Sequence, residues 1–111
     1  LQYLDRNGEF LTTLVDGFIQ ETESLARDLQ QATEARDGST YRDCLYALKG
    51  SAANIGASQL HQLCRQALAA DAGGGDIGCS DWLARIRQCI RLTHETLLDS
   101  GVMAREPQHP G

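Results

Sequence analysis

Proline occurs only twice in this chain, as Pro107 and Pro110, and both lie in the last few residues. Because proline breaks helices, its absence elsewhere leaves long helices open on backbone grounds. From Gly8 to Arg36, apolar residues recur three and four positions apart, the spacing of one face of an amphipathic helix. We expect this face to bury Leu11, Leu14, Val15, Phe18, Ile19, Thr22, Leu25, Leu29 and Ala32. Gly17 interrupts the helix at a cost of about 1 kcal/mol relative to alanine, which would fit a close contact with another helix.

A second helix follows the Asp37-Gly38 break in this pattern. Ser39 or Thr40 is placed to cap it, because a side-chain oxygen there can accept from the unpaired amides of the first turn. The helix runs to about Ile55, and Gly56 can end it in the left-handed conformation. Its buried face is expected to comprise Tyr41, Cys44, Leu45, Leu48, Ala52 and Ile55.

Two more amphipathic helices are predicted in the second half of the chain. One starts near Ser58, ends near Asp71 and is expected to bury Leu60, Leu63, Cys64, Ala67 and Leu68. A glycine-rich linker over 72–79 follows, and Ser80 or Asp81 is placed to cap a last helix that ends near Gly101. The last helix is expected to bury Trp82, Leu83, Ile86, Cys89, Ile90, Thr93 and Leu97.

Four such helices joined by short connections predict an all-α fold, an antiparallel up-down four-helix bundle. With 111 residues, the chain has enough core for one domain, which we place at 1–103 with a flexible tail at 104–111. A short extra helix near Tyr3 and Leu4 would fit across one end of the bundle. Because the sequence starts at Leu1 rather than Met, we expect it to be a domain of a longer protein.

The charge balance restricts the partners of this domain. Ten Lys and Arg residues stand against 15 Asp and Glu, giving a net charge of −5 that repels nucleic acid and anionic lipid. No apolar run approaches the roughly 20 residues of a membrane-spanning helix, and the N-terminus has no signal-peptide pattern. We therefore expect a cytoplasmic domain without direct membrane insertion. No long exposed apolar stripe is visible, which favours a monomer.

The cysteines are Cys44, Cys64, Cys79 and Cys89, and none forms a C-x-x-C pair. Cys44, Cys64 and Cys89 fall on apolar helix faces, so we expect them to be buried, reduced thiols. Cys79, in the glycine-rich linker, is expected to be accessible.

The histidines do not predict a metal site or a cofactor site. His61 lies three residues before Cys64 on one helix face, but two ligands are too few for zinc and no second pair is visible. His94 and His109 belong to no motif. We therefore expect neither metal nor cofactor.

The segment from Cys44 to Ala57 carries the strongest functional signal. Tyr46 lies about 200° from Leu48 around the helix and so points away from the core. Its neighbours on that face are Lys49, Gly50 and Ala53, with Arg42 one turn back. A solvent-facing helix surface normally carries long side chains, and a glycine inside a helix is costly. The face therefore predicts a docking patch with a basic rim.

The run ALKGSAANIGA closely resembles the signature of histidine-containing phosphotransfer (HPt) domains, which places a histidine two residues before Leu-Lys-Gly-Ser and a Gly-Ala pair after it. The matching positions are Leu48, Lys49, Gly50, Ser51, Gly56 and Ala57. The resemblance covers roughly residues 3 to 100. It implies that Lys49 lies beside a phosphoryl group, that Gly50 leaves room for a response-regulator receiver domain, and that Tyr46 stands where the family has its phosphorylated histidine.

This replacement changes the chemistry that the position can support. Imidazole, with an ordinary pKa of about 6.5, offers a neutral ring nitrogen that can attack an aspartyl phosphate. A phenol, with an ordinary pKa of about 10, needs a base, and the motif supplies none. We therefore expect phosphotransfer to be lost, through either an engineered or a natural change.

Three functions remain open at this point. The first is a phosphorelay domain of a hybrid sensor kinase that has lost its acceptor. The second is a dedicated module that binds a receiver or another protein without phosphate chemistry. The third, a helical assembly module, has the least support because no exposed apolar stripe accompanies it.

Overall fold

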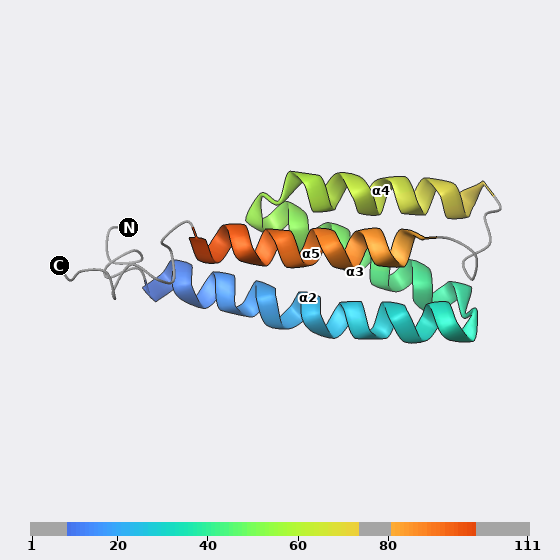
Figure 1. Cartoon of the computed structure of the whole chain (residues 1–111), viewed down its shortest axis with the longest axis horizontal. Helices are drawn as coiled ribbons and strands as arrows, with labels where there is room; N and C mark the ends of the chain where they lie inside the picture. The colour runs from blue at the N-terminus through green and yellow to red at the C-terminus, as the bar shows by residue number, and fades with distance from the viewer. Residues whose placement is uncertain (1–8, 74–80, 100–111) are drawn as a thin grey trace.

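The computed structural model describes residues 9–73 and 81–99, and every regular element in these two ranges is an α-helix. The helices are α2 (Glu9–Ala35), α3 (Gly38–Ile55), α4 (Ser58–Ala72) and α5 (Trp82–Asp99) (Figure 1). The all-α prediction is therefore confirmed, and the helix bounds agree with the periodicity to within a few residues. The predicted extra N-terminal helix, the tail at 104–111 and Cys79 lie outside the described residues.

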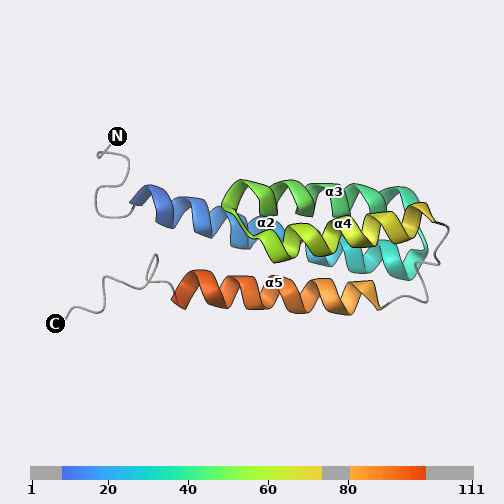
Figure 2. The ribbon, with the colours of Figure 1, turned by 90° about the horizontal axis from the view of Figure 1, so that it is seen from above.

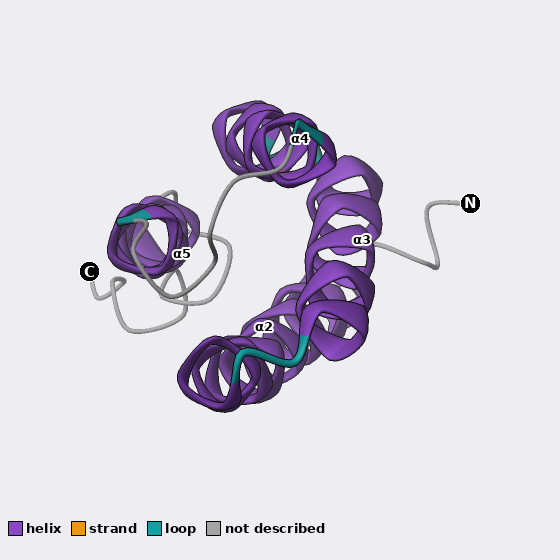
Figure 3. Cartoon of the chain, turned by 90° about the vertical axis from the view of Figure 1, so that its right-hand side faces the viewer, coloured by secondary structure: helices purple, strands orange, loops and turns teal. Residues whose placement is uncertain are grey.

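Each helix runs antiparallel to the one before it, as the colour gradient in Figures 1 and 2 shows. Viewed end-on, the four helices form a ring in which each contacts two neighbours (Figure 3). Helix α3 packs against α2 and α4, and α5 packs against the same two helices from the opposite side. The up-down bundle is therefore confirmed, with α3 and α5 on opposite sides of it.

Aliphatic side chains from all four helices make up the core. The fully buried ones include Leu29, Leu45, Leu48, Leu60 and Ile86. Burying one such side chain stabilises the fold by roughly 1.5–3 kcal/mol. Leu14 departs from the prediction, because 41% of it remains exposed on the flank of α2 beside α3. Val15 and Phe18 occupy the core positions of that helix segment instead.

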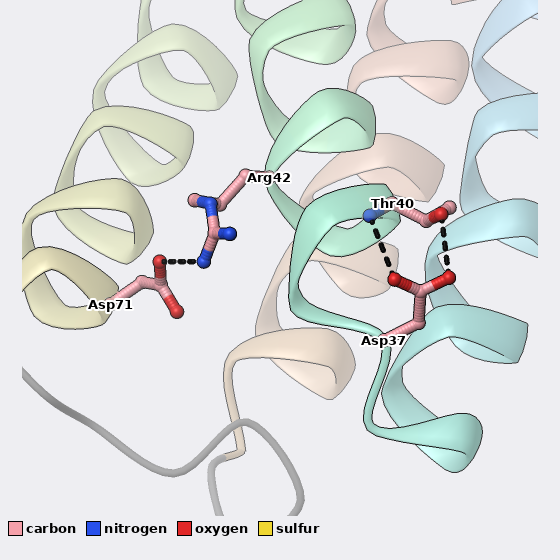
Figure 4. Close-up of polar contacts among 4 residues, drawn as sticks. All are labelled: Asp37, Thr40, Arg42 and Asp71. Atoms are coloured by element: carbon pink, nitrogen blue, oxygen red, sulfur yellow. Dashed lines mark hydrogen bonds and ion pairs between the residues drawn. The ribbon is translucent and has the colours of Figure 1, made fainter.

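The α2–α3 turn corrects the predicted cap of the second helix. Asp37, rather than Ser39 or Thr40, is the N-cap, and its carboxylate accepts from the Thr40 backbone amide at 3.2 Å and from the Thr40 hydroxyl at 2.7 Å (Figure 4). The extended backbone of Asp37, with φ −90° and ψ 92°, holds its side chain over the first turn. The physical reason is that Gly38 already belongs to the helix, so the cap lies two residues before Ser39 and three before Thr40.

The α3–α4 turn confirms the role predicted for Gly56. Its φ of 79° lies in the left-handed region that glycine tolerates best. The Gly56 amide donates to the Ala53 carbonyl at 3.3 Å, and the Ala57 amide donates to the Ala52 carbonyl at 2.8 Å. These two bonds form a Schellman motif, so the Gly-Ala pair serves to end α3 and turn the chain into α4.

Candidate functional site

The residues singled out on α3 divide between its two faces. Leu48 is fully buried, and Ser51 is nearly so. Tyr46, Gly50 and Ala53 lie on the exposed face, as their helical phase predicts. The buried positions of this short motif therefore stabilise the bundle, and the exposed positions form a surface.

Tyr46 is the most prominent side chain on this surface, with 58% of it exposed. The Lys49 ammonium lies 5.5 Å from the centre of its ring, within the range of a cation–π contact. Within the described residues, the Tyr46 hydroxyl has no hydrogen-bond partner, and no carboxylate or imidazole is positioned to take its proton. The site therefore presents a phenol beside a cation, without a general base.

Gly50 leaves open space on the same face. A Cβ atom built there would meet nothing within 4 Å, so packing inside this chain does not require a glycine. A glycine inside a helix costs about 1 kcal/mol relative to alanine. The open surface beside Tyr46 is therefore free for close approach by another molecule.

Arg42 is held away from this surface by α4. Its guanidinium donates to the Asp71 carboxylate at 3.1 Å, and that carboxylate is largely buried (Figure 4). Half-exposed ion pairs of this kind contribute about 0–1 kcal/mol. Lys49 therefore lies beside Tyr46, whereas Arg42 pairs with Asp71 and links α3 to α4.

A groove between α2 and α3, with a volume of about 390 Å³, adjoins the exposed face of α3. Leu14, Gly17 and Phe18 line it from α2, and Ser51 and Asn54 line it from α3. A Cβ atom at Gly17 would meet nothing within 4 Å, so the close helix contact considered from the sequence is not present there. Sequence reasoning missed this groove, although the half-exposed Leu14 and the glycine one turn later are its signal.

The cysteines agree only in part with the prediction. Cys44 and Cys64 are buried, and burial raises the pKa of the Cys64 thiol to about 12. Cys89 is only partly buried, which corrects the prediction, because it packs against the core cluster from its edge. His61 is partly exposed beside the buried Cys64. Over 9–73 and 81–99, no three His, Cys, Asp or Glu side chains come together in a way that could hold a metal ion.

His94 joins α5 to α2 through a contact that the sequence did not reveal. Its Nε2 atom lies 2.8 Å from the Thr22 hydroxyl, and its ring meets Phe18 edge-on at 6.0 Å between centroids. The Thr22 hydroxyl donates to the Phe18 carbonyl at 2.8 Å, so its oxygen is left to accept from Nε2–H. Burial lowers the pKa of His94, and the Glu23 carboxylate opposes this in part.

Comparison with known proteins places these observations in a family context. The family model described as Hpt domain matches residues 13–96, which is most of the chain and includes all of α3 and α4. No curated protein and no solved structure matches. Among the described helices, none is both long and apolar enough to cross a membrane.

Proposed function

Because the chain belongs to the Hpt domain family, whose members serve in phosphorelay signalling, we propose that it docks response-regulator receiver domains but accepts no phosphoryl group from them. The observation that carries this proposal is the exposed phenol of Tyr46 beside Lys49, with the open surface of Gly50 one turn away. We take a hybrid sensor kinase to be the parent protein.

The loss of chemistry follows from what the transfer step requires. An acceptor atom must donate a lone pair to phosphorus while the bond from phosphorus to the aspartate oxygen breaks. A neutral imidazole nitrogen can do this directly, whereas a phenol must also give up its proton to a base. No described residue lies within hydrogen-bond distance of the Tyr46 hydroxyl to serve as that base. Without such a base, we expect no attack by Tyr46 on the aspartyl phosphate.

Docking depends on shape and charge that remain in place without an acceptor. Gly50 and Ala53 let a partner surface approach α3 closely, and Lys49 supplies a positive charge beside the approach. The groove with Leu14 at its edge offers apolar contact to the same partner. Small transient interfaces of this kind bind weakly, with a Kd in the micromolar range or so.

The central experiment mixes the purified domain with a panel of receiver domains phosphorylated by acetyl phosphate. We expect no acid-labile, base-stable phosphate on the wild-type chain by intact mass. The Tyr46→His variant should acquire it from at least one receiver, because Lys49 and Gly50 already surround the position. Phosphate on His61 or His94 of the wild-type chain would contradict the proposal.

A second experiment locates the docking surface. Gly50→Arg should abolish receiver binding in calorimetry, since the added side chain occupies the open surface, where its Cβ atom meets nothing within 4 Å. Gln62→Arg, which adds the same charge at an exposed position on α4, is the matched control and should bind as the wild type does. Equal binding by both variants would exclude this face of α3.

A dedicated binding module is the second candidate function. The contact between Lys49 and the Tyr46 ring favours it, because the tyrosine is itself integrated into the surface. Under this alternative, Tyr46→His takes no phosphate from any receiver and weakens binding of the natural partner. Under the first proposal, the same variant gains phosphate and keeps its receiver binding.

A further inference from the structure

A second groove, between α2 and α5, gathers basic side chains on the side of the bundle away from α3. Its volume is about 310 Å³. Arg27, Arg87 and Arg91 line it together with His94 and a single carboxylate, Glu23, and Ala26 and Ile90 also line it. Because α5 and α3 lie on opposite sides of the bundle, this groove is separate from the surface around Tyr46 (Figure 3).

The spacing of the arginines concentrates positive charge along the groove. On α5, Arg87, Arg91 and His94 follow one another at helical intervals of four and three residues, so they lie on one face. On α2, Arg27 contributes a third guanidinium from the opposite wall. The chain as a whole has 15 acidic and 10 basic residues, whereas this groove has three guanidinium groups and one carboxylate. The local charge is therefore positive, opposite to the net charge of the chain.

Within the described residues, the guanidinium groups of Arg87 and Arg91 bond to amide side chains rather than to carboxylates. Arg87 donates to the side-chain oxygen of Gln30, and Arg91 donates to that of Gln88 at 3.3 Å. Across the described ranges, Arg27, Arg87 and Arg91 make no ion pair with a carboxylate. Each guanidinium carries five N–H donors, so most of these donors remain available to a ligand.

We propose that the groove between α2 and α5 binds a small phosphate-type oxyanion that carries more than one negative charge. Guanidinium groups bind such oxyanions through paired N–H donors, and two opposed walls allow contact from both sides. The volume suits a small ligand, no Phe, Tyr or Trp side chain among the described residues lines the groove, and the His94 ring is already engaged by Thr22 and Phe18. An inorganic diphosphate group therefore fits better than a nucleotide.

The test is a calorimetric titration of the whole chain with inorganic pyrophosphate at pH 7. We expect Arg27→Gln and Arg91→Gln each to weaken binding by about tenfold or more, the loss that follows from removing a charged hydrogen-bond donor. Arg65→Gln removes the same charge from an exposed position on α4 and should leave the affinity unchanged. Arg27, Arg65 and Arg91 are all exposed, so we expect the three variants to keep the fold.

Either of two calorimetric results would overturn the proposal. One is an absence of binding by the wild-type chain at low ionic strength, where charge attraction is strongest. The other is an equal loss in Arg65→Gln, which would mean general ionic attraction rather than a site. Amide chemical shifts of the wild-type chain provide an independent test. Pyrophosphate bound at this groove should shift only signals from α2 and α5. Shifts spread over all four helices would contradict the proposal.

Discussion

Glycines at three positions show how one residue type serves different ends. Gly56 has a φ of 79°, which a residue with a Cβ atom adopts only with strain. Gly17 and Gly50 lie inside regular helices, where a Cβ atom would meet nothing within 4 Å. The fold therefore needs the first glycine, whereas the other two reduce stability and leave surface open.

Alanine substitutions separate these roles. Gly17→Ala and Gly50→Ala should each raise the free energy of unfolding by about 0.5–1 kcal/mol, because alanine loses less backbone entropy in a helix. Gly56→Ala should lower it by about 1 kcal/mol or more, since the left-handed turn becomes strained. Urea unfolding measures all three. Destabilisation by Gly50→Ala would mean that the chain itself requires a glycine there.

Thiol reactivity distinguishes Cys64 from Cys89. Cys64 is fully buried with a pKa raised to about 12, so it should react with a thiol reagent only when the bundle unfolds. Cys89 is partly exposed at the edge of the core and should react faster in the native state. Mass spectrometry of digested, pulse-labelled protein measures the two rates. Equal rates would contradict the different burial of these two cysteines.

Among the elements, α3 depends most on local signals, because both of its ends are closed by specific caps. Asp37 begins it, and the pKa of the Asp37 carboxyl is lowered chiefly by the hydrogen bonds from the Thr40 side chain and backbone. Gly56 ends it in a Schellman turn. These caps limit fraying of the helix that carries Tyr46 and Lys49.

Removal of the Asp37 cap should reduce stability in a pH-dependent way. A carboxyl with a lowered pKa in the folded state contributes stability at neutral pH, and this contribution disappears as the pH falls through the folded pKa. Asp37→Ala should therefore lower the Tm at pH 7 and differ less from the wild type at acid pH. Ser39→Ala, two residues after the cap, is the control. An unchanged Tm for Asp37→Ala at pH 7 would contradict the role of Asp37 as the stabilising N-cap of α3.

For the whole molecule, the contact between α2 and α5 closes the ring of helices. The Thr22 hydroxyl and the His94 ring meet in this contact, and Glu23, Arg27, Arg87 and Arg91 line the groove beside it. Protonation of His94 leaves its Nε2–H bond to Thr22 intact. Protonation of His94 is unfavourable in the folded state because it places a positive charge in a half-buried position next to guanidinium groups.

The stability of the bundle should therefore fall on mild acidification. Burial lowers the pKa of His94 in the folded state, so the unfolded chain takes up a proton more readily. The free energy of unfolding should decrease as the pH falls through the ordinary histidine pKa of about 6.5, and level off below the folded pKa. An NMR titration of the His94 ring should give a midpoint below the ordinary value. A midpoint above it would contradict the prediction.

The candidate site could be predicted from the sequence because its residues lie within three turns of one helix. Helical phase alone places Tyr46 outside and Leu48 inside, and both placements are confirmed. The cap at Asp37 was missed because Ser39 and Thr40 are equally good capping residues by type. Only the backbone conformation of the turn decides between them.

The sequence by itself determined the helices, their buried faces and the family signature, because all three depend on residues a few positions apart. The tertiary structure decided the pairing of Arg42 with Asp71, the hydrogen bond of Thr22 with His94, and the exposure of Leu14 and Cys89. Each of these depends on how distant helices are aligned along one another. That alignment results from packing over the entire core, so no local pattern records it.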